Sequence, residues 1–186
     1  MGGGKSRGIF LDRDGTLCEN GAGYVGEEEK IVPCKGASRV LGEMVDGGYK
    51  LFLVTNQSGV GRGFFPLGSA LACNRRLLDL LGHGNIFTEI CLSTGTPHSP
   101  DSYRKPSPRF ILEMCAKYDM DVASCWVIGD SSCDVEMAKN AGANAIVIDA
   151  NANEPDSVGR PQLLFRPDLE SAWEAISVWG AKNIGT

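Results

Sequence analysis

The 186-residue sequence lacks the features of membrane proteins, secreted proteins and general nucleic-acid binders. It contains no apolar run near the ~18 residues that a membrane-spanning helix needs, and no signal-peptide pattern opens it. Its 18 Lys and Arg residues are outnumbered by 23 Asp and Glu residues, whereas a nucleic-acid binder needs a basic face. We therefore expect a cytoplasmic protein that contacts no membrane, and we do not expect it to bind nucleic acid.

Cysteine pairs at metal-site spacing are also missing. The seven cysteines are odd in number, and no two form a C-x-x-C pattern, which favours free, mostly buried thiols in a reducing compartment. The hydrophobic fraction of 42% is too high for a disordered chain. The length suits one domain over residues 1–186, and we expect it to be a monomer.

Short apolar runs alternate with longer stretches of helical periodicity. The apolar runs span residues 9–11, 50–54, 90–92, 126–128 and 145–148, and such runs are typical of strands buried on both faces of a parallel sheet. Between and after these runs, apolar residues recur at helical spacing and predict five helices. The five stripes are Val40, Leu41, Met44 and Val45; then Leu67, Ala70, Leu71, Leu78 and Leu81; then Phe110, Met114, Cys115 and Tyr118; then Val135, Ala138 and Ala141; and finally Leu169, Ala172, Trp173 and Ile176. This order predicts an α/β fold with a Rossmann-like open parallel sheet and helices on both faces.

Two segments are predicted to lie outside this framework. Residues 1–7 are a glycine-rich leader that we expect to be flexible. Residues 18–34 are rich in Gly and Glu, and they predict a flap beside the end of the first strand.

Polar clusters follow three of the predicted strands, and a fourth cluster precedes a predicted helix. Their sequences are Asp12-Arg13-Asp14-Gly15-Thr16, Thr55-Asn56-Gln57-Ser58-Gly59, Arg104-Lys105-Pro106 and Gly129-Asp130-Ser131-Ser132-Cys133-Asp134. In a parallel sheet the carboxyl ends of the strands meet at one edge, where ligands bind. The four clusters are therefore expected to converge.

The chemistry of the clusters indicates a phosphate site with a metal ion. Carboxylates of Asp12, Asp14 and Asp130 crowded at one edge repel each other, by about 4 kcal/mol for two charges ~4 Å apart at an effective dielectric of 20. Oxygen ligands of this kind select Mg²⁺, while Lys105 and the Thr55 hydroxyl supply donors for an anion. An EF-hand loop is excluded because its glycine would fall too early and its twelfth position lacks glutamate. A phospho-receiver domain would need an acceptor aspartate after a middle strand, and none is present.

These motifs resemble the four motifs of the haloacid dehalogenase superfamily. The matching elements are Asp12-x-Asp14-Gly15-Thr16, Thr55, Lys105 and Gly129-Asp130-x-x-x-Asp134, and the resemblance covers residues 9–148. The finer wording, with Thr55-Asn56-Gln57-Ser58-Gly59-Val60-Gly61-Arg62-Gly63 and Arg104-Lys105-Pro106, is similar to the branch of heptose-bisphosphate and histidinol-phosphate phosphatases. Members lack a large cap domain, and the short spacing between motifs here agrees with that.

The resemblance implies a role for each motif residue. Asp12 would be the nucleophile that forms an aspartyl-phosphate. Asp14 would protonate the leaving oxygen and then take a proton from water, so we expect surroundings that favour its neutral form. Asp12, the backbone carbonyl of Asp14 and Asp130 would hold Mg²⁺, and Asp134 would order the groups around the metal ligands. Thr55 and Lys105 would bind the transferring phosphoryl group.

The loop before Arg104 departs from the family pattern. Members of this branch commonly bind zinc there through a Cys-x-His and a Cys-x-Cys set, but here only Cys91 and His98 are possible ligands. Two ligands do not make a structural zinc site. We therefore expect no structural zinc, with Cys91 in a strand and His98 in a surface loop.

The substrate is expected to be a small-molecule phosphate ester. The candidate substrate contacts are Asn20, Gly23, Tyr24, Asn56, Gln57, Ser58, Arg62 and Arg104. Arg104 would hold a second phosphate by a bidentate bond, while Arg62 would contact the substrate or brace the flap. The leading hypothesis is a phosphatase that removes the 7-phosphate of D-glycero-D-manno-heptose 1,7-bisphosphate. The alternatives are a histidinol-phosphate phosphatase, a polynucleotide 3′-phosphatase and a non-catalytic phospho-ligand-binding module.

Overall fold

The computed structural model describes residues 6–21, 23–99, 103–151, 156–157, 159 and 161–183. Most of the predicted leader and residue 22 of the predicted flap lie outside these residues. The strands are β1 (Arg7–Leu11), β2 (Tyr49–Asn56), β3 (Phe87–Ser93), β4 (Trp126–Gly129), β5 (Asn144–Ile148) and β6 (Leu163–Arg166). The α-helices are α1 (Ala37–Asp46), α2 (Ser58–Gly61), α3 (Leu67–Leu81), α4 (Arg109–Lys117), α5 (Ser132–Ala141) and α6 (Leu169–Asn183), and the 3₁₀ helices are η1 (Glu28–Lys30) and η2 (Val122–Ser124).

The strands form one parallel sheet in the order β3-β2-β1-β4-β5-β6. Strand β1 lies near the middle, where Ile9 pairs with Leu51 of β2 and with Trp126 of β4. The chain reverses its direction of travel across the sheet between β1 and β4. A crevice forms at such a switch point beyond the carboxyl ends of the strands. The predicted Rossmann-like α/β fold is confirmed.

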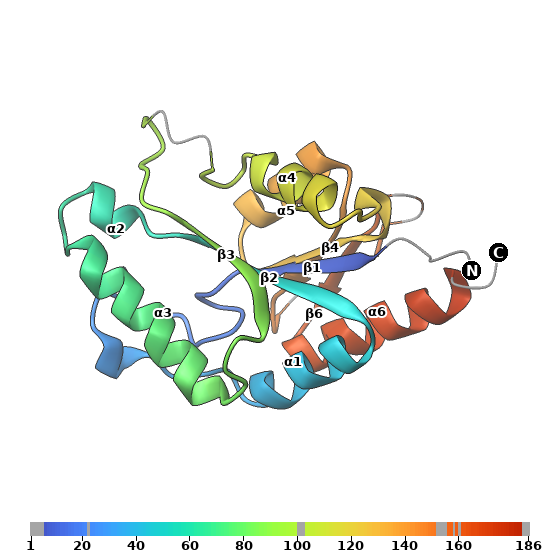
Figure 1. Ribbon diagram of the computed structural model, residues 1–186, viewed down its shortest axis with the longest axis horizontal. Helices are drawn as coiled ribbons and strands as arrows, with labels where there is room; N and C mark the ends of the chain where they lie inside the picture. Colours follow the sequence, from blue (N-terminus) through green and yellow to red (C-terminus); the bar gives the residue numbers. More distant parts are fainter. Residues whose placement is uncertain are drawn as a thin grey trace.

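Helices cover both faces of the sheet (Figure 1). Helices α1, α3 and α6 lie on one face, and α4 and α5 lie on the other. Successive strand residues point to opposite faces, so Ile9 and Leu11 of β1 pack toward α1 and α6, whereas Phe10 packs toward α4 and α5. Both faces of β1 are therefore buried, which explains its continuous apolar sequence.

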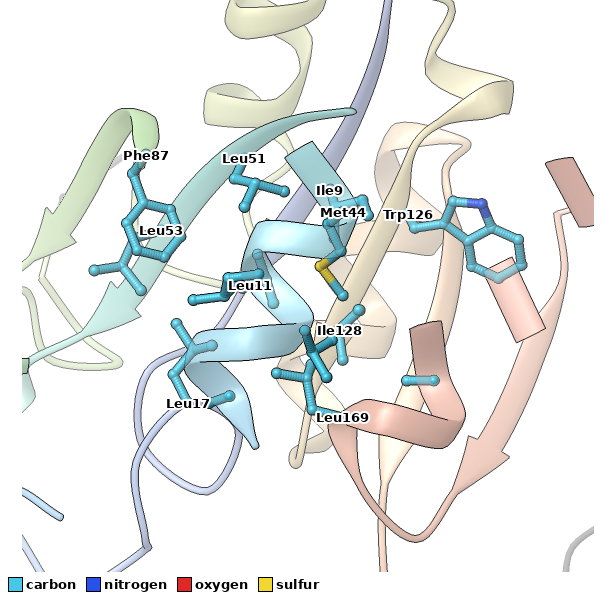
Figure 2. Packing of buried hydrophobic residues seen from close by; sticks show 14 of the residues in the cluster. Ile9, Leu11, Leu17, Met44, Leu51, Leu53, Phe87, Trp126, Ile128 and Leu169 are labelled. Atoms are coloured by element: carbon cyan, nitrogen blue, oxygen red, sulfur yellow. The ribbon is translucent and has the colours of Figure 1, made fainter. Parts of the chain in front are cut away.

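Two clusters of buried side chains hold the layers together. On the α1 and α6 side, Met44 of α1 packs among strand residues near Leu11 and Ile128 (Figure 2). On the opposite side Phe10 stacks on Phe52, with ring centroids 4.6 Å apart. Burying side chains of this size stabilises the fold by roughly 1.5–3 kcal/mol each. The sheet is therefore a rigid base for the loops that follow its strands.

The structure corrects parts of the predicted helical stripes. In the α3 stripe Ala70 and Leu81 are buried as predicted, but Leu67 and Leu71 are 46% and 41% exposed, and the buried face is completed by Cys73, Asn74 and Leu77. Val45 of α1 is also exposed. In each case an apolar residue sits beside the buried stripe rather than on it, and single exposed apolar residues are common on protein surfaces. The short elements β6 and α2 were not predicted, because neither carries a periodic pattern long enough to recognise.

The predicted flap, residues 18–34, leaves the sheet edge after β1 and returns to it. Its base is closed by hydrogen bonds from Glu19 N to Val32 O and from Cys34 N to Leu17 O, at 2.8 and 2.9 Å. Tyr24 near its tip is half exposed. Among the described residues, the helices are too short or too polar to cross a bilayer.

Candidate active site

The loops that carry the motif residues meet beyond the carboxyl ends of β1, β2 and β4. Asp12 follows the last residue of β1, and Asp12 N donates a hydrogen bond to Ile128 O of β4 at 2.9 Å. Thr55 is the penultimate residue of β2, and Asp130 follows β4 directly. The parallel sheet therefore brings these polar residues to one edge, as the sequence predicted.

Lys105 joins two carboxylates in the interior of this site. Its Nζ lies 2.7 Å from Asp12 Oδ1 and 2.8 Å from Asp134 Oδ1. The Lys105 side chain is 1% exposed, and those of Asp12 and Asp134 are 11% and 3% exposed. Arg13 N donates a further hydrogen bond of 2.7 Å to Asp12 Oδ1. A buried ion triad of this kind fixes the Asp12 carboxylate in one orientation, because each partner would be costly to leave unpaired.

Three carboxylates form a cluster that fits a divalent cation. One oxygen atom each from Asp12, Asp130 and Asp134 can be chosen so that all lie within 4.8 Å of one another. An all-oxygen set suits Mg²⁺, which takes few carboxylates and keeps several waters. Asp134, which was expected to order the groups around the metal ligands, belongs to this cluster, and both of its oxygens also bond protein donors. Asn20 Nδ2 donates to Asp130 Oδ2 at 3.0 Å, which fixes the orientation of that carboxylate.

Two glycines allow the cluster to form against the backbone. A Cβ atom at Gly15, where φ is +79°, would lie 1.9 Å from Asp130 Oδ2, and a Cβ at Gly129 would lie 2.2 Å from Asp134 Cγ. Any larger residue would displace these carboxylates. Asp134 is held further by the first turn of α5, where Ser131 N and the Ser131 hydroxyl both donate to its Oδ2. These bonds tie the first turn of α5 together, and the other oxygen of Asp134 accepts from Lys105.

Asp14 faces a different set of partners. Arg13 donates from Nε to Asp14 Oδ1 at 3.0 Å and from Nη2 to Asp14 Oδ2 at 2.9 Å. Gln57 Nε2 donates to Asp14 Oδ2 at 3.0 Å and to Thr55 Oγ1 at 2.7 Å. The Arg13 side chain, to which the sequence reasoning assigned no role, therefore supplies two of the three bonds to the Asp14 carboxylate, and Gln57 supplies the third.

The loop that carries Arg104 and Lys105 is anchored to the end of β2. Asn56 Nδ2 donates to Lys105 O at 3.1 Å, and Lys105 N donates to Asn56 Oδ1 at 3.0 Å. Arg104 Nη1 donates to Ser58 Oγ at 2.8 Å, and that hydroxyl donates to Gly95 O at 3.0 Å. The peptide bond between Lys105 and Pro106 is cis. Protein hydrogen bonds thus hold this loop beside β2.

Burial and charge shift the ionisation of the central groups. Burial raises the pKa of Asp12 to about 7; Asp134 adds to this effect, and Lys105 opposes it. Burial also raises the pKa of Asp130, again with a contribution from Asp134. Burial disfavours the charged form of Lys105, but the carboxylates of Asp12 and Asp134 outweigh it and raise the pKa of the ammonium group. Lys105 is therefore charged near neutral pH, whereas a nearby cation would shift Asp12 toward its ionised form.

The predicted substrate contacts fall into two groups. In the first group Gln57 and Ser58 are buried, Asn56 and Arg104 are partly buried, and the Asn56 side chain hydrogen-bonds backbone atoms of Lys105. The exposed group lies on the flap and the turn after α2: Asn20, Gly23, Tyr24 and Arg62. Within it the guanidinium of Arg62 lies 6.0 Å from the ring of Tyr24, which in turn lies 5.2 Å from the ring of Phe64.

The zinc-loop residues occupy the predicted positions. Cys91 lies in β3 and is buried, and His98 lies in an exposed turn. Among the described residues, the cluster of Asp12, Asp130 and Asp134 is the one group of three potential metal ligands.

Three structural contributors were missed at the sequence level: Arg13, Asn74 and Ser131. Arg13 Nη1 donates to Asn74 Oδ1 at 2.9 Å. A signal existed for two of them. Ser131-x-x-Asp134 is a capping-box pattern, and Asn74 is a polar residue at the spacing of the buried face of α3.

Known proteins share both the sequence and the fold. A HAD-hydrolase-like family model matches residues 102–172. The D-glycero-beta-D-manno-heptose-1,7-bisphosphate 7-phosphatase of Rhodopseudomonas palustris is 37% identical over 144 residues, covering 72% of this chain and 78% of that protein. The histidine biosynthesis bifunctional protein HisB of Legionella pneumophila (strain Lens) is 32% identical over 142 residues, covering 75% of this chain and 40% of that protein.

A solved structure matches the fold over nearly its whole length. It is the D,D-heptose 1,7-bisphosphate phosphatase from B. bronchiseptica, complexed with magnesium and phosphate. The TM-score is 0.80 at 23% identity, with 93% of this chain and 99% of that chain covered. Together with the sequence relatives, this shows that the chain belongs to the haloacid dehalogenase superfamily, in a branch of phosphatases, and is a phosphoric monoester hydrolase.

Proposed function

We propose that this chain is a Mg²⁺-dependent phosphatase that removes the 7-phosphate of a D-glycero-D-manno-heptose 1,7-bisphosphate through an aspartyl-phosphate on Asp12. The observation that carries the chemistry is the buried contact between Asp12 and Lys105 beside two further carboxylates. The substrate class is supported by relatives named for that reaction, one of which is 37% identical. The reaction class and the substrate thus rest on separate observations.

The first displacement uses Asp12 and Asp14. An Asp12 oxygen attacks phosphorus while the bond from phosphorus to the sugar oxygen breaks, and Asp14 gives its proton to that leaving oxygen. Lys105 and the Thr55 hydroxyl bind the oxygens of the transferring group, on which negative charge builds up. The ammonium beside Asp12 also reduces the repulsion between the carboxylate and the phosphate dianion.

The second displacement regenerates the nucleophile. Asp14, now ionised, takes a proton from a water molecule that attacks phosphorus, and the bond to Asp12 breaks to release inorganic phosphate. The contact with Arg13 suits Asp14 in this half of the reaction, because the guanidinium stabilises the carboxylate.

The magnesium site would be formed by Asp12 and Asp130, with the backbone carbonyl of Asp14 and with Asp134 beside them. The clustering of the Asp12, Asp130 and Asp134 oxygens within 4.8 Å supports this assignment. When bound, the ion would neutralise charge on the phosphoryl oxygens.

Substrate selection is proposed to reside in the loops around the site. Arg104 would hold the second phosphate, and its bond to Ser58 would fix its position. Asn56 and Gln57 would act by holding Lys105, Thr55 and Asp14 in place. Asn20, Gly23 and Tyr24 on the flap and Arg62 after α2 are exposed and would contact the sugar; Asn20 already bonds Asp130 of the carboxylate cluster. We also propose that the protein acts as a monomer in the cytoplasm.

A second candidate substrate is histidinol phosphate. It is favoured by the match to the histidine biosynthesis bifunctional protein, of which this chain spans less than half. A panel of heptose 1,7-bisphosphate anomers, histidinol phosphate, a 3′-phosphorylated oligonucleotide and p-nitrophenyl phosphate, each with and without Mg²⁺, distinguishes these substrates. The highest kcat/KM is expected for a heptose bisphosphate. A higher value for histidinol phosphate would replace the proposed substrate, and no release from any ester would refute the proposed reaction.

A further inference from the structure

A fully buried arginine, Arg13, separates Asp12 and Asp14 in the sequence. Arg13 has no exposed surface. Its Nε and Nη2 form a fork on the two oxygens of Asp14, and its Nη1 donates to Asn74 Oδ1 at 2.9 Å. A guanidinium presents five N–H donors in a fixed plane, and a buried charge is tolerated where its bonds are made. The plane of Arg13 is therefore set jointly by Asp14 on one side and Asn74 on the other.

Asn74 belongs to a helix that otherwise contributes packing. It is 5% exposed and lies on the buried face of α3 with apolar residues that include Ala70, Leu77 and Leu81. An amide side chain on such a face is unfavourable unless it is hydrogen-bonded. Its bond to Arg13, 61 residues away in the sequence, links α3 to the loop after β1.

The fork determines where the Asp14 carboxylate points. Arg13 bonds both of its oxygens, and Gln57 adds a third bond to Oδ2. The Asp14 side chain is still 26% exposed, so it faces both its buried partners and the open site. The rate of proton transfer depends on this position, because misplacement of a reacting group by about 1 Å lowers the rate on the order of 10²-fold.

We infer that Arg13 and Asn74 are positioning residues for the acid–base step: Asn74 fixes the guanidinium of Arg13, and Arg13 fixes the carboxylate of Asp14 that passes a proton to the leaving oxygen. This inference rests on the proposed role of Asp14. Arg13 keeps its own protons throughout, since arginine stays charged in proteins. The proton that moves is the one on Asp14; it goes to the leaving oxygen as the bond from phosphorus to that oxygen breaks and the bond to Asp12 forms.

The positioning role predicts a defect that depends on the leaving group. A leaving group that is a strong base needs a proton as it departs, whereas a weakly basic one leaves without help. Loss of Asn74 leaves Asp12, Lys105 and the phosphate donors untouched. The loss should therefore slow the hydrolysis of esters whose leaving group is a strong base, and leave the hydrolysis of esters of acidic phenols nearly unchanged.

The test compares phenyl phosphate with p-nitrophenyl phosphate as substrates of the full-length chain with Mg²⁺. In Asn74→Leu, kcat/KM for phenyl phosphate should fall by about 10-fold to 10²-fold, the loss expected when a reacting group is misplaced. The value for p-nitrophenyl phosphate should fall by less than about 2-fold, because its leaving group needs no proton. The matched control is Leu77→Val, a change one turn further along the buried face of α3, which should leave the ratio of the two values unchanged. If Asn74→Leu does not fold, Asn74→Ser provides the same test with a side chain too short to reach Arg13.

The outcomes distinguish a failure of the positioning role of Arg13 and Asn74 from a failure of the proposed acid–base role of Asp14. An equal loss for both esters, or no loss, in the Asn74 variant would overturn the inference. Asp14→Asn tests the underlying role: it should lower kcat/KM for phenyl phosphate by about 10²–10⁴ and more than for p-nitrophenyl phosphate. If Asp14→Asn shows that selective loss and the Asn74 variants do not, the inference alone fails. If Asp14→Asn affects both esters equally, the proposed role of Asp14 fails.

Discussion

The ammonium of Lys105 lies 2.7 Å from the Asp12 carboxylate and is shared with Asp134, so one buried cation serves two buried anions. Asp130 adds a third carboxylate to the same cluster. Three carboxylates and one ammonium leave two negative charges uncompensated, and a divalent ion would neutralise them. Charge balance therefore agrees with the oxygen chemistry of the site in favouring Mg²⁺.

Replacing the nucleophile should abolish turnover and preserve the fold. In Asp12→Asn the side-chain oxygen can still accept from Lys105 Nζ and Arg13 N, the two donors to Asp12 Oδ1. Amide oxygen does not form the aspartyl-phosphate, so p-nitrophenyl phosphate turnover should drop by at least about 10³-fold, the scale of loss seen when a nucleophile is removed. Circular dichroism would check the fold. Activity retained above that level would refute covalent catalysis by Asp12.

Removing the charge of Lys105 should affect both activity and stability. Lys105→Met is expected to lower kcat/KM by about 10²–10³, as for loss of one transition-state donor. It also leaves Asp12 and Asp134 buried without their shared cation, which should cost about 3–5 kcal/mol in the free energy of unfolding at neutral pH. Urea denaturation and steady-state kinetics measure the two effects.

A double variant distinguishes those two effects of Lys105. Adding Asp134→Asn to Lys105→Met removes the repulsion between the carboxylates, so much of the stability should return while the activity stays low. Full recovery of activity in the double variant would contradict a direct role for Lys105 in phosphoryl transfer.

Magnesium should stabilise the protein more as the pH rises toward neutrality. The pKa of Asp12 rises on folding from 3.8 to about 7 because the group is buried. The contribution of this carboxyl to stability is therefore fully present below about pH 4 and is lost as the pH rises through about 7. Magnesium binds the ionised carboxylate, so its effect should increase over the same range. With Mg²⁺ at about 100 times its Kd near neutral pH, a gain of about 2.7 kcal/mol is expected, or roughly 5–10 °C in Tm.

Differential scanning calorimetry after EDTA treatment, with and without added Mg²⁺, measures this linkage. Asp12→Asn is the control, since its amide does not titrate in this range, and the pH dependence should shrink in that variant. A Mg²⁺-induced Tm shift that is the same at about pH 5 and about pH 7.5, below and near the pKa of Asp12, would contradict the linkage.

Purified protein should contain no stoichiometric zinc. Cys91 is a buried strand residue, and His98 is an exposed turn residue on the same loop connection, while a structural zinc site needs four ligands. Elemental analysis should find well under one zinc per chain, and Cys91→Ser should keep kcat/KM within about 2-fold, far from the 10–100-fold losses that follow damage to a metal site. One zinc per chain would show that residues outside the expected pair complete a site.

The sequence predicted the sheet better than the helix faces. Continuous apolar runs such as the one around Phe10 identify a buried strand, because both faces of β1 are covered. The stripe on α3 was harder to place, since Leu67 and Leu71 are within one helical turn of the buried Ala70, and periodicity alone does not decide which of these neighbours is buried. The four-residue β6 pairs only along β5 at the sheet edge and carries too little pattern to predict.

The site shows the same division between local signals and long-range contacts. The convergence of Asp12, Lys105 and Asp130 could be predicted because parallel topology forces strand ends together. The hydrogen bond between Arg13 and Asn74 could not be predicted, because it depends on how α3 is rotated against the sheet.

The rings of Tyr24 and Phe64 pack against each other, are 52% and 63% exposed, and lie outside the two hydrophobic clusters. Substitutions at such exposed positions usually change stability by less than about 0.5 kcal/mol. If Tyr24 contacts the sugar as proposed, this aromatic pair can change without disturbing the sheet or the buried charges. Substrate preference and thermodynamic stability would then be encoded in separate parts of the molecule.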